Sequence, residues 1–586
     1  RENKKDRYML SASLNYKILD WLTVSGRVSL DNANNDYTEK FYASTNTQLT
    51  EGSSRGLYGI TKTSDKQLYA DFLVSINKNF GEDWNLSANI GGSFTDVRSD
   101  LMTVRGGIAD GSDAFPGEQV GLTNYFAIQN LSQKARRLQE GWREQTQSIY
   151  ASAELGYKST YYLTLTGRND WPSQLAGPNS TSKSFFYPSV GLSVVLSELM
   201  PNLNKDYLSY LKLRGSFASV GSAFQRYLAN PRYEWSTSAN QWSVLTQYPM
   251  YSLKPERTNS FEIGFNARFL KYFELDATYY NAKTENQTFN PQLPINKYSK
   301  MYIQTGSVRN QGIELALNFE NTWRNFTWMS GLTYSMNKNK IESLADNVIN
   351  PITGQLFSIP SLDMGGYADL RFILREGGSM GDLYSRTDLR RDANGAIYMD
   401  ESNNVYTQKI DNPDSYIKLG SVLPKGNLAW RNNFMWKNFH VGFMISARLG
   451  GVVFSRTQAI LDKFGVSEAS ADARDNGFVL INGNDRVNPE NWYTTVGSTA
   501  VPQYYTYSAT NVRLQEASIG YTIPRKWLAN VCDIKVSLIG RNLWMIYNKA
   551  PFDPEAVAST DNFYQGIDNF MMPSLRNVGF SLNFKF

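Results

Sequence analysis

The residues whose types and spacing come closest to a metal site surround Gly395. The candidate ligands are Asp392, Asn394, Asp400 and Glu401. Carboxylate and amide oxygens around a turn glycine are the ligands that calcium prefers. The spacing is not that of an EF-hand, and Asp or Asn beside Gly is equally common in ordinary tight turns. The segment is therefore a calcium site or a plain turn, and no other cofactor is expected.

Side chains for covalent or acid–base catalysis are scarce. The chain has one cysteine, Cys532, and one histidine, His440. This excludes an intrachain disulfide framework and removes nearly all transition-metal sites and most histidine-centred catalysis. Carboxylates are plentiful, but no pair is singled out as a general acid and base. We therefore expect a protein that is not an enzyme.

Aromatic side chains in the long loops are candidates for contact with a substrate or a partner. One group is Trp235, Trp242, Tyr248 and Tyr251, and the other is Trp492, Tyr493, Tyr504 and Tyr505. Such rings could stack on sugars, hold peptide side chains or bind another protein, because Tyr and Trp are favoured at interfaces. They could equally pack the loops together, and the sequence leaves these alternatives open.

The composition excludes two other classes of protein. There are 59 Lys and Arg against 54 Asp and Glu, a formal charge of +5, and no long basic run, so a nucleic-acid partner is not expected. No stretch approaches 18 consecutive apolar residues, so no transmembrane helix is expected. The mean hydropathy is −0.43 although aromatic residues reach 14%, which favours an all-β protein with amphipathic aromatic side chains.

Alternation of apolar and polar residues dominates the chain and predicts about 17 β-strands. Clear examples are residues 8–18, 22–30 and 578–586. Only segments 132–137 and 458–463 suggest helical turns. Several polar positions carry full charges, which predicts a water-exposed face. They are Glu262, Arg268, Glu274, Asp276, Glu314, Arg448 and Lys535.

Connections between these strands alternate in length. Short ones include 17–21, 80–84, 158–161, 270–273 and 436–439, whereas the longest span about 97–144, 219–256, 337–425 and 452–510. Trp and other aromatic residues cluster beside the short turns. Short turns at one end, long loops at the other and an aromatic belt are typical of a transmembrane antiparallel up-and-down β-barrel of the outer-membrane type. A propeller or solenoid would show a fixed repeat, and none is present.

The first residues lead directly into a strand pattern, without an initiator Met or a signal peptide. Outer-membrane barrels have even strand numbers and short periplasmic turns. An odd count of 17 places the first strand's start at the outside, so we expect 1–586 to be a partial barrel that lacks N-terminal strands.

Five segments resemble the SusC/RagA family of TonB-linked outer-membrane transporters of Bacteroidetes, and they keep that family's order. They are residues 253–264 (LKPERTNSFEIG), 513–524 (RLQEASIGYTIP), 540–544 (GRNLW), 551–555 (PFDPE) and 572–576 (MPSLR). The segment 420–438 is also similar to a family motif. Together these pieces make the resemblance specific.

The resemblance implies a barrel of about 22 strands, of which about five are missing here, and a missing N-terminal plug that contacts TonB. It further implies active import of glycan or peptide oligomers through the Gram-negative outer membrane, together with a SusD-like surface lipoprotein and in contact with membrane lipid. Two alternatives stay open from the sequence, a passive porin-type channel and a surface adhesin or scaffold barrel.

Overall fold

The computed structural model describes residues 1–111, 120–177, 180, 182–229, 231–236, 239, 241–243, 247–248, 253–290, 302–350, 354–498, 501–528, 531–561 and 564–585. Tyr251, one of the predicted contact residues, lies outside these ranges. Within them, 17 strands belong to one antiparallel sheet, which confirms the strand count predicted from the alternation. None of the described helices is long and apolar enough to cross a membrane.

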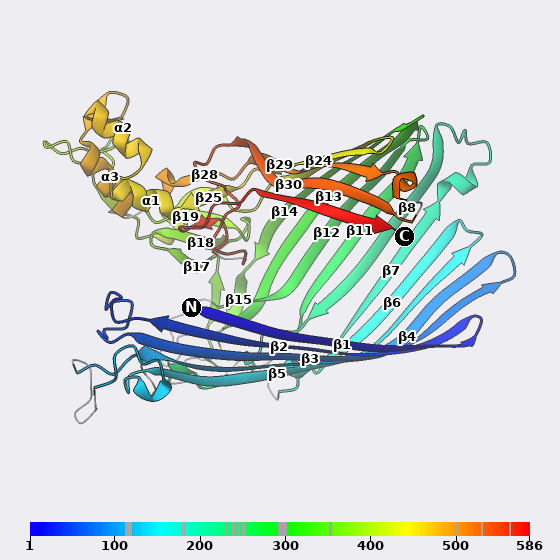
Figure 1. Cartoon of the computed structure of the whole chain (residues 1–586), viewed down its shortest axis with the longest axis horizontal. Helices are drawn as coiled ribbons and strands as arrows, with labels where there is room; N and C mark the ends of the chain where they lie inside the picture. The colour runs from blue at the N-terminus through cyan, green and yellow to red at the C-terminus, as the bar shows by residue number, and fades with distance from the viewer. Residues whose placement is uncertain are drawn as a thin grey trace. The chain divides into compact units, whose positions relative to one another are not determined.

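The chain divides into two compact units, and each is described by itself. The first comprises Arg1–Leu192, Phe217–Asn259 and Asn286–Gln304. Its sheet strands follow one another in sequence and pair as antiparallel neighbours (Figure 1). They are β1 (Glu2–Leu19), β2 (Leu22–Phe41), β3 (Leu57–Phe80), β4 (Trp84–Gly107), β5 (Arg136–Tyr157) and β6 (Tyr161–Pro172).

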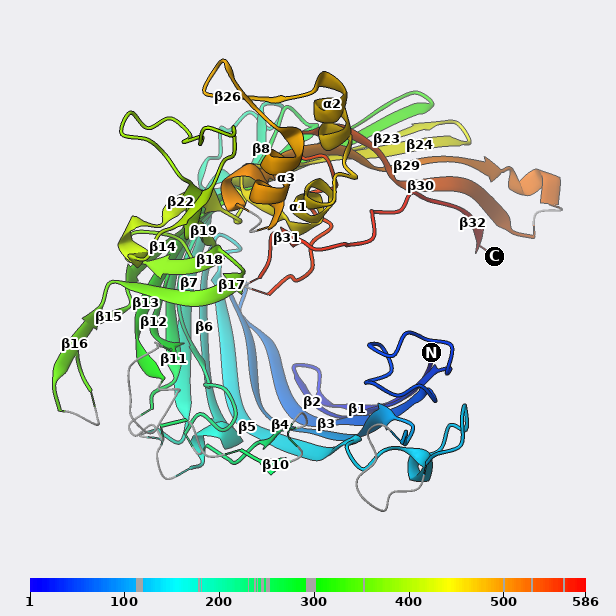
Figure 2. The same cartoon turned by 90° about the vertical axis from the view of Figure 1, so that its left-hand side faces the viewer.

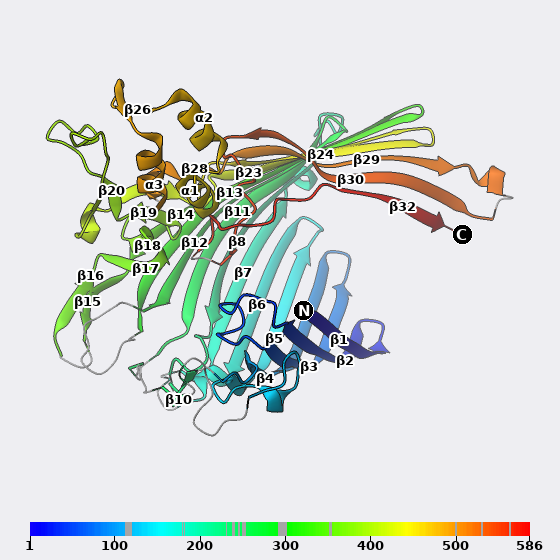
Figure 3. The same cartoon turned by 60° about the vertical axis from the view of Figure 1, so that its left-hand side comes forward.

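Five strands contribute residues to both units: β7 (Phe185–Val195), β8 (Leu208–Ser222), β11 (Glu256–Phe269), β12 (Phe273–Phe289) and β13 (Ile303–Trp323). The second unit continues with β14 (Phe326–Ser343), β23 (Gly426–Trp436), β24 (Phe439–Leu449), β29 (Asn511–Ile523), β30 (Asp533–Asn548) and β32 (Asn577–Lys585). The strands from β13 onward also pair in sequence order (Figure 3).

Side-chain alternation places apolar residues on one face of the sheet and polar residues on the other. In β2 and β3, Val28 and Phe72 are 52% and 55% exposed, whereas the intervening Arg27 forms an ion pair with Asp71 at 2.6 Å. Large apolar side chains left exposed on a sheet face are what a strand needs to contact lipid. The polar face is satisfied by ion pairs and hydrogen bonds, such as Ser75 Oγ to Asn89 Oδ1 at 2.7 Å.

The predicted short turns are confirmed, since β3–β4, β5–β6, β11–β12 and β23–β24 are joined by a few residues each. Lys158 and Ser159 both adopt φ near +50°, the backbone conformation of tight hairpin turns that match the strand twist. Aromatic side chains beside the turns contact one another. The ring of Trp84, which is exposed, packs against that of Tyr157 with the centroids 4.5 Å apart.

Two sequence predictions need correction in the first unit. The segment 97–144 is strand at both of its ends, because β4 continues to Gly107 and β5 begins at Arg136, so the long connection is shorter than predicted. Charged residues occupy both faces there and hide the alternation, but they pair across the strands, as Arg143 does with Asp96 at 2.6 Å. The same register makes 136–137 the start of β5 rather than the end of a helical turn. Three residues, Ile128–Asn130, do form a 3-10 turn just before it.

Long connections of the second unit also differ from irregular loops. Segment 458–463 is confirmed as helical within α1 (Arg456–Lys463), and two further helices, α2 (Glu468–Asn476) and α3 (Pro489–Ser498), follow it. Short strands complete these connections: β15 (Ala345–Ile349), β16 (Leu356–Ile359), β17 (Ser361–Tyr367), β18 (Leu370–Arg375), β19 (Asp382–Ser385), β20 (Thr387–Leu389), β21 (Thr407–Lys409), β22 (Ile417–Ser421), β25 (Val452–Ser455), β26 (Val479–Ile481), β27 (Asp485–Val487), β28 (Thr506–Ser508) and β31 (Ile567–Asp568).

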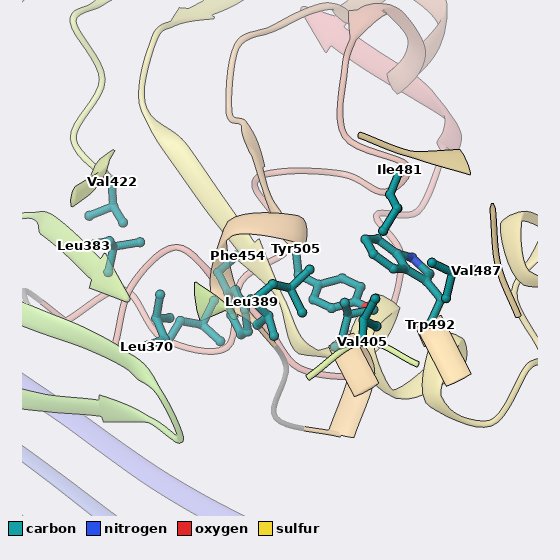
Figure 4. Packing of buried hydrophobic residues seen from close by; sticks show 14 of the residues in the cluster. Leu370, Leu383, Leu389, Val405, Val422, Phe454, Ile481, Val487, Trp492 and Tyr505 are labelled. Carbon is teal, nitrogen blue, oxygen red and sulfur yellow. The ribbon is translucent and has the colours of Figure 1, made fainter. Parts of the chain in front are cut away.

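We call β17–β22, β25–β28, β31 and α1–α3 the loop layer. Strands β17, β18, β19 and β22 form a small sheet, and β25 pairs with both β28 and β31. Figure 2 shows α1 beside β31, and α3 packs against α1. One buried apolar cluster joins these pieces, and it includes Leu370, Phe372, Leu383, Phe454, Tyr505 and Ile567 (Figure 4). The loop layer is therefore a folded body with its own core.

Candidate substrate and partner surfaces

Two of the four residues in the second predicted aromatic group, Trp492 and Tyr505, lie in the core of the loop layer. Trp492 is 9% exposed and Tyr505 is 2% exposed, and Figure 4 shows Trp492 beside Ile481 and Val487. Tyr504 packs edge-on against Trp492, with ring centroids 5.4 Å apart. These contacts correspond to the packing alternative for Trp492 and Tyr505. Contact with a ligand stays a prediction for the more exposed Tyr493 and Tyr504.

Asp462 is the polar centre of this region. Its Oδ2 accepts a hydrogen bond from the Tyr505 hydroxyl at 3.0 Å, and its Oδ1 accepts one from Gln458 Nε2 at 3.1 Å. Burial raises the pKa of Tyr505 above its ordinary value, with the Asp462 charge adding to the effect. The phenol thus stays a hydrogen-bond donor, which fixes α1 to the segment before β28.

A cavity of about 270 Å³ opens between the three helices. It is lined mainly by polar and charged residues, among them Asp462, Arg474, Glu490 and Tyr493. The Tyr493 hydroxyl donates to the carbonyl oxygen of Ala469 at 3.0 Å, so its ring forms a fixed wall. Tyr493 could be predicted as a contact residue from its aromatic type, but nothing in the sequence predicted that Arg474 would line the same cavity.

The first aromatic group belongs to the other unit. Trp235 in β9 (Trp235–Ser236) and Trp242 in β10 (Gln241–Trp242) pair across a short hairpin, with ring centroids 5.4 Å apart at 80°. Trp242 is 66% exposed, and Tyr248 is half-buried. Among the described members of this group, Trp242 therefore has the most surface to offer a ligand.

The four candidate calcium ligands stand in two separate turns. Asp392 Oδ1 accepts the backbone N–H groups of Asn394 and Ala396, and Asp400 accepts those of Ser402 and Asn404. Hydrogen bonds from Tyr406 and from the Asn404 backbone hold the pKa of Asp400 down, at about 2. Asn394 and Glu401 are exposed. Among the described residues no three His, Cys, Asp or Glu side chains cluster as a metal site, and the choice between a calcium site and two plain turns is left to experiment.

The predicted water-facing charges all belong to strands of the second unit. Asp276 is paired with Arg214 at 2.7 Å and Glu274 with Arg268 at 3.6 Å. Glu314 and Arg448 lie on one polar face of β13 and β24. The polar face is thus partly neutralised and partly left charged.

Sequence reasoning missed the most buried ion pair in this region. Arg513, at the start of β29, donates two hydrogen bonds to Asp553, at 2.9 and 3.3 Å, and their side chains are 5% and 9% exposed. Glu555 lies 3.1 Å from the same guanidinium. Two segments singled out separately, 513–524 and 551–555, therefore contact each other, and only the fold could show this.

His440 Nε2 is 2.9 Å from Thr522 Oγ1, and Cys532 is a free, buried thiol. Within the described ranges neither side chain belongs to a group that could hold a metal ion.

The chain is similar in sequence to known proteins. A sequence model of the family described as TonB dependent receptor-like, beta-barrel matches residues 1–543. Two curated relatives from Formosa agariphila, TonB-dependent receptor P3 and TonB-dependent receptor P26, are each 26% identical over 554 residues, which cover 88% of this chain and 52% of theirs. The chain spans about half the length of these relatives.

Solved structures share the fold. The RagAB peptide importer in its "open-open" state aligns over 100% of this chain and 61% of that chain, with a TM-score of 0.76 and 16% identity. Its "closed-closed" state gives a TM-score of 0.73 at 17% identity, over 100% of this chain and 62% of that one. At such identities the likeness is one of fold alone.

Proposed function

The chain belongs to the TonB dependent receptor-like β-barrel family, and from that premise we propose that the whole protein actively imports nutrient oligomers, glycan or peptide, using energy delivered by TonB. The family match over residues 1–543 is the observation that carries the proposal. Membership also confirms the predicted barrel class and the outer-membrane localisation. The exposed apolar face and the aromatic residues beside the short turns agree with a barrel that contacts lipid.

We further propose a SusD-like surface lipoprotein as the partner and the loop layer as its contact surface. In the proposed orientation, with short turns periplasmic, the loop layer is extracellular. It offers a folded surface, and its connection between α1 and α2 exposes two large apolar side chains, Phe464 at 70% and Val466 at 67%. Exposed apolar residues on a rigid body are typical of protein contact sites.

Nutrient uptake tests the import function. The full-length receptor, expressed in its native host, should support growth on oligomers only when TonB is present. Deleting TonB should abolish that growth, while a passive porin would be indifferent to the deletion. Growth that is unchanged without TonB would contradict active import.

Gentle solubilisation tests the partner. The receptor should be isolated together with a lipoprotein, and Phe464→Ser with Val466→Ser should weaken the complex. Leu356→Ser is the matched control, because Leu356 is also exposed, at 63%, but lies outside the loop layer in β16. Equal losses from both changes would contradict this surface.

A further inference from the structure

A charged cleft lies on the polar face of β13, β14, β23 and β24 in the second unit. Its volume is about 610 Å³. Register places Glu314 opposite Ser335, Ser335 opposite Asn427, and Asn427 opposite Arg448. Glu314 and Arg448 are therefore the two ends of one cross-strand row.

The floor of the cleft consists of small side chains. Between the charged ends lie Ser335 and Asn427, and the next row on the same face is Ala316, Thr333, Ala429 and Ser446. Because side chains on one face alternate with those on the other, these short residues leave open space above the backbone. An extended ligand can lie in that space along the row.

Other charges around the cleft have partners. Asp276 is paired with Arg214 at 2.7 Å, and Glu555 is held by Arg513 at 3.1 Å. No ion pair is formed by Glu314 or Arg448 within the described part of the chain. Arg448 donates from Nη2 to the Val422 carbonyl at 2.7 Å, while its buried Nε has no protein partner there.

The spacing of the two unpaired charges defines a ligand length. Three strand spacings of about 4.8 Å separate the backbones of Glu314 and Arg448 by roughly 14 Å. Because side chains in strands stand roughly perpendicular to the sheet, a similar separation is expected between the two charged groups. Subtracting about 3 Å at each end for a hydrogen bond leaves roughly 8 Å between the ligand's own charges. Extended peptide advances about 3.3–3.6 Å per residue, so the two ends of a di- or tripeptide fit.

We infer that this cleft binds a short zwitterionic peptide, with its ammonium at Glu314 and its carboxylate at Arg448. The inference rests on the proposed import function and narrows its substrate class. Hydrogen bonds between charged groups are the strong ones, and a peptide would satisfy both protein charges together. A neutral sugar would fill the cleft but bring no counter-charge to either residue.

Calorimetric titration of the purified full-length receptor tests the site with trialanine as the probe. N-acetyl-trialanine, which lacks the ammonium, and trialanine amide, which lacks the carboxylate, should each bind about tenfold or more weakly. Maltotriose, a neutral ligand of similar length, should bind more weakly still. Trialanine that does not bind, or that binds no better than maltotriose, overturns the inference.

Matched variants then assign each end. Glu314→Gln should weaken trialanine about tenfold yet leave N-acetyl-trialanine unchanged, and Arg448→Gln should do the same with trialanine amide as the insensitive ligand. Glu262→Gln is the control, because Glu262 is an exposed β11 carboxylate outside the cleft. Trialanine affinity unaffected by both cleft variants overturns the inference. If TonB-dependent uptake of another nutrient persists, the import function stands while the peptide site fails.

Discussion

Replacing Asp553 by Asn should open the connection between β30 and β32. Asp553 is 9% exposed and accepts two hydrogen bonds from the 5% exposed Arg513, together with one from Ser574 Oγ at 2.5 Å. Breaking a buried ion pair by removing one partner costs about 3–5 kcal/mol. Because Glu555 remains 3.1 Å from Arg513, we expect the lower end, about 3 kcal/mol.

Hydrogen exchange followed by mass spectrometry measures this change locally. A loss of about 3 kcal/mol corresponds to a roughly hundredfold increase in opening, so amides of 549–557 should lose about that much protection in Asp553→Asn. Glu555→Gln is the matched control. Its carboxylate is 43% exposed, and an exposed pair contributes only about 0–1 kcal/mol.

Acid should reproduce the effect in the unmodified protein. Burial alone would raise the pKa of Asp553, but hydrogen bonds from Arg513 and Ser574 outweigh it and place the pKa below the ordinary value. A lowered carboxylate pKa stabilises the fold above the ordinary value, and the contribution is lost as the pH falls through the lowered one. Equal, small effects of Asp553→Asn and Glu555→Gln, with no acid sensitivity at 549–557, would refute this reasoning.

Three further predictions follow from exposure and packing. Leu582→Arg, on the apolar face of β32, should lower barrel stability by about 2–4 kcal/mol near the membrane midplane, whereas Asn583→Arg on the other face should lower it far less. Heat-modifiability on gels compares the stability of the two variants. Equal losses of stability would mean that the two faces are misassigned. Trp492→Ala should cost about 3–5 kcal/mol of loop-layer stability, measured by limited proteolysis, while Trp242→Ala, at a 66% exposed ring, should leave proteolysis unchanged. Chelation by EDTA should not alter hydrogen exchange at 390–406, because Asp392 and Asp400 already accept backbone N–H groups; calcium-dependent protection there would establish the calcium site instead.

The number of strands and their turns could be predicted from the sequence because a strand with one face in lipid and the other in water has apolar residues at every second position. The row from Leu10 through Leu30 to Leu68 shows this directly, since all three are cross-strand neighbours on the apolar face. Beyond the membrane that constraint disappears, and neither β4 after Phe94 nor β5 before Ile149 shows a two-residue period. There the strands are specified by cross-strand pairs such as Arg143 with Asp96.

Helices α2 and α3 escaped prediction because both are short, and because α3 is buried in part by residues distant in the sequence, such as Val405 in the cluster of Trp492. Signals for α2 were present: Ser467 caps its first turn by accepting from Ser470 N, and Gly477 ends it at φ +81°. The candidate aromatic residues were recognised by type alone. Their burial depends on partners such as Leu370 and Ile567, about 200 residues apart, and no local pattern encodes that contact.

The shared core of the loop layer makes it cooperative. Its buried side chains come from three separate connections, those after β14, β24 and β30, so none of the three can leave without exposing the others to water. We therefore expect the layer to open as a single all-or-none unit rather than loop by loop. A displacement of Ile567, which precedes the last strand, would also shift Leu370 and Tyr505, because all three belong to the same buried cluster. Segments of the chain that are distant in sequence can therefore respond together to one binding event.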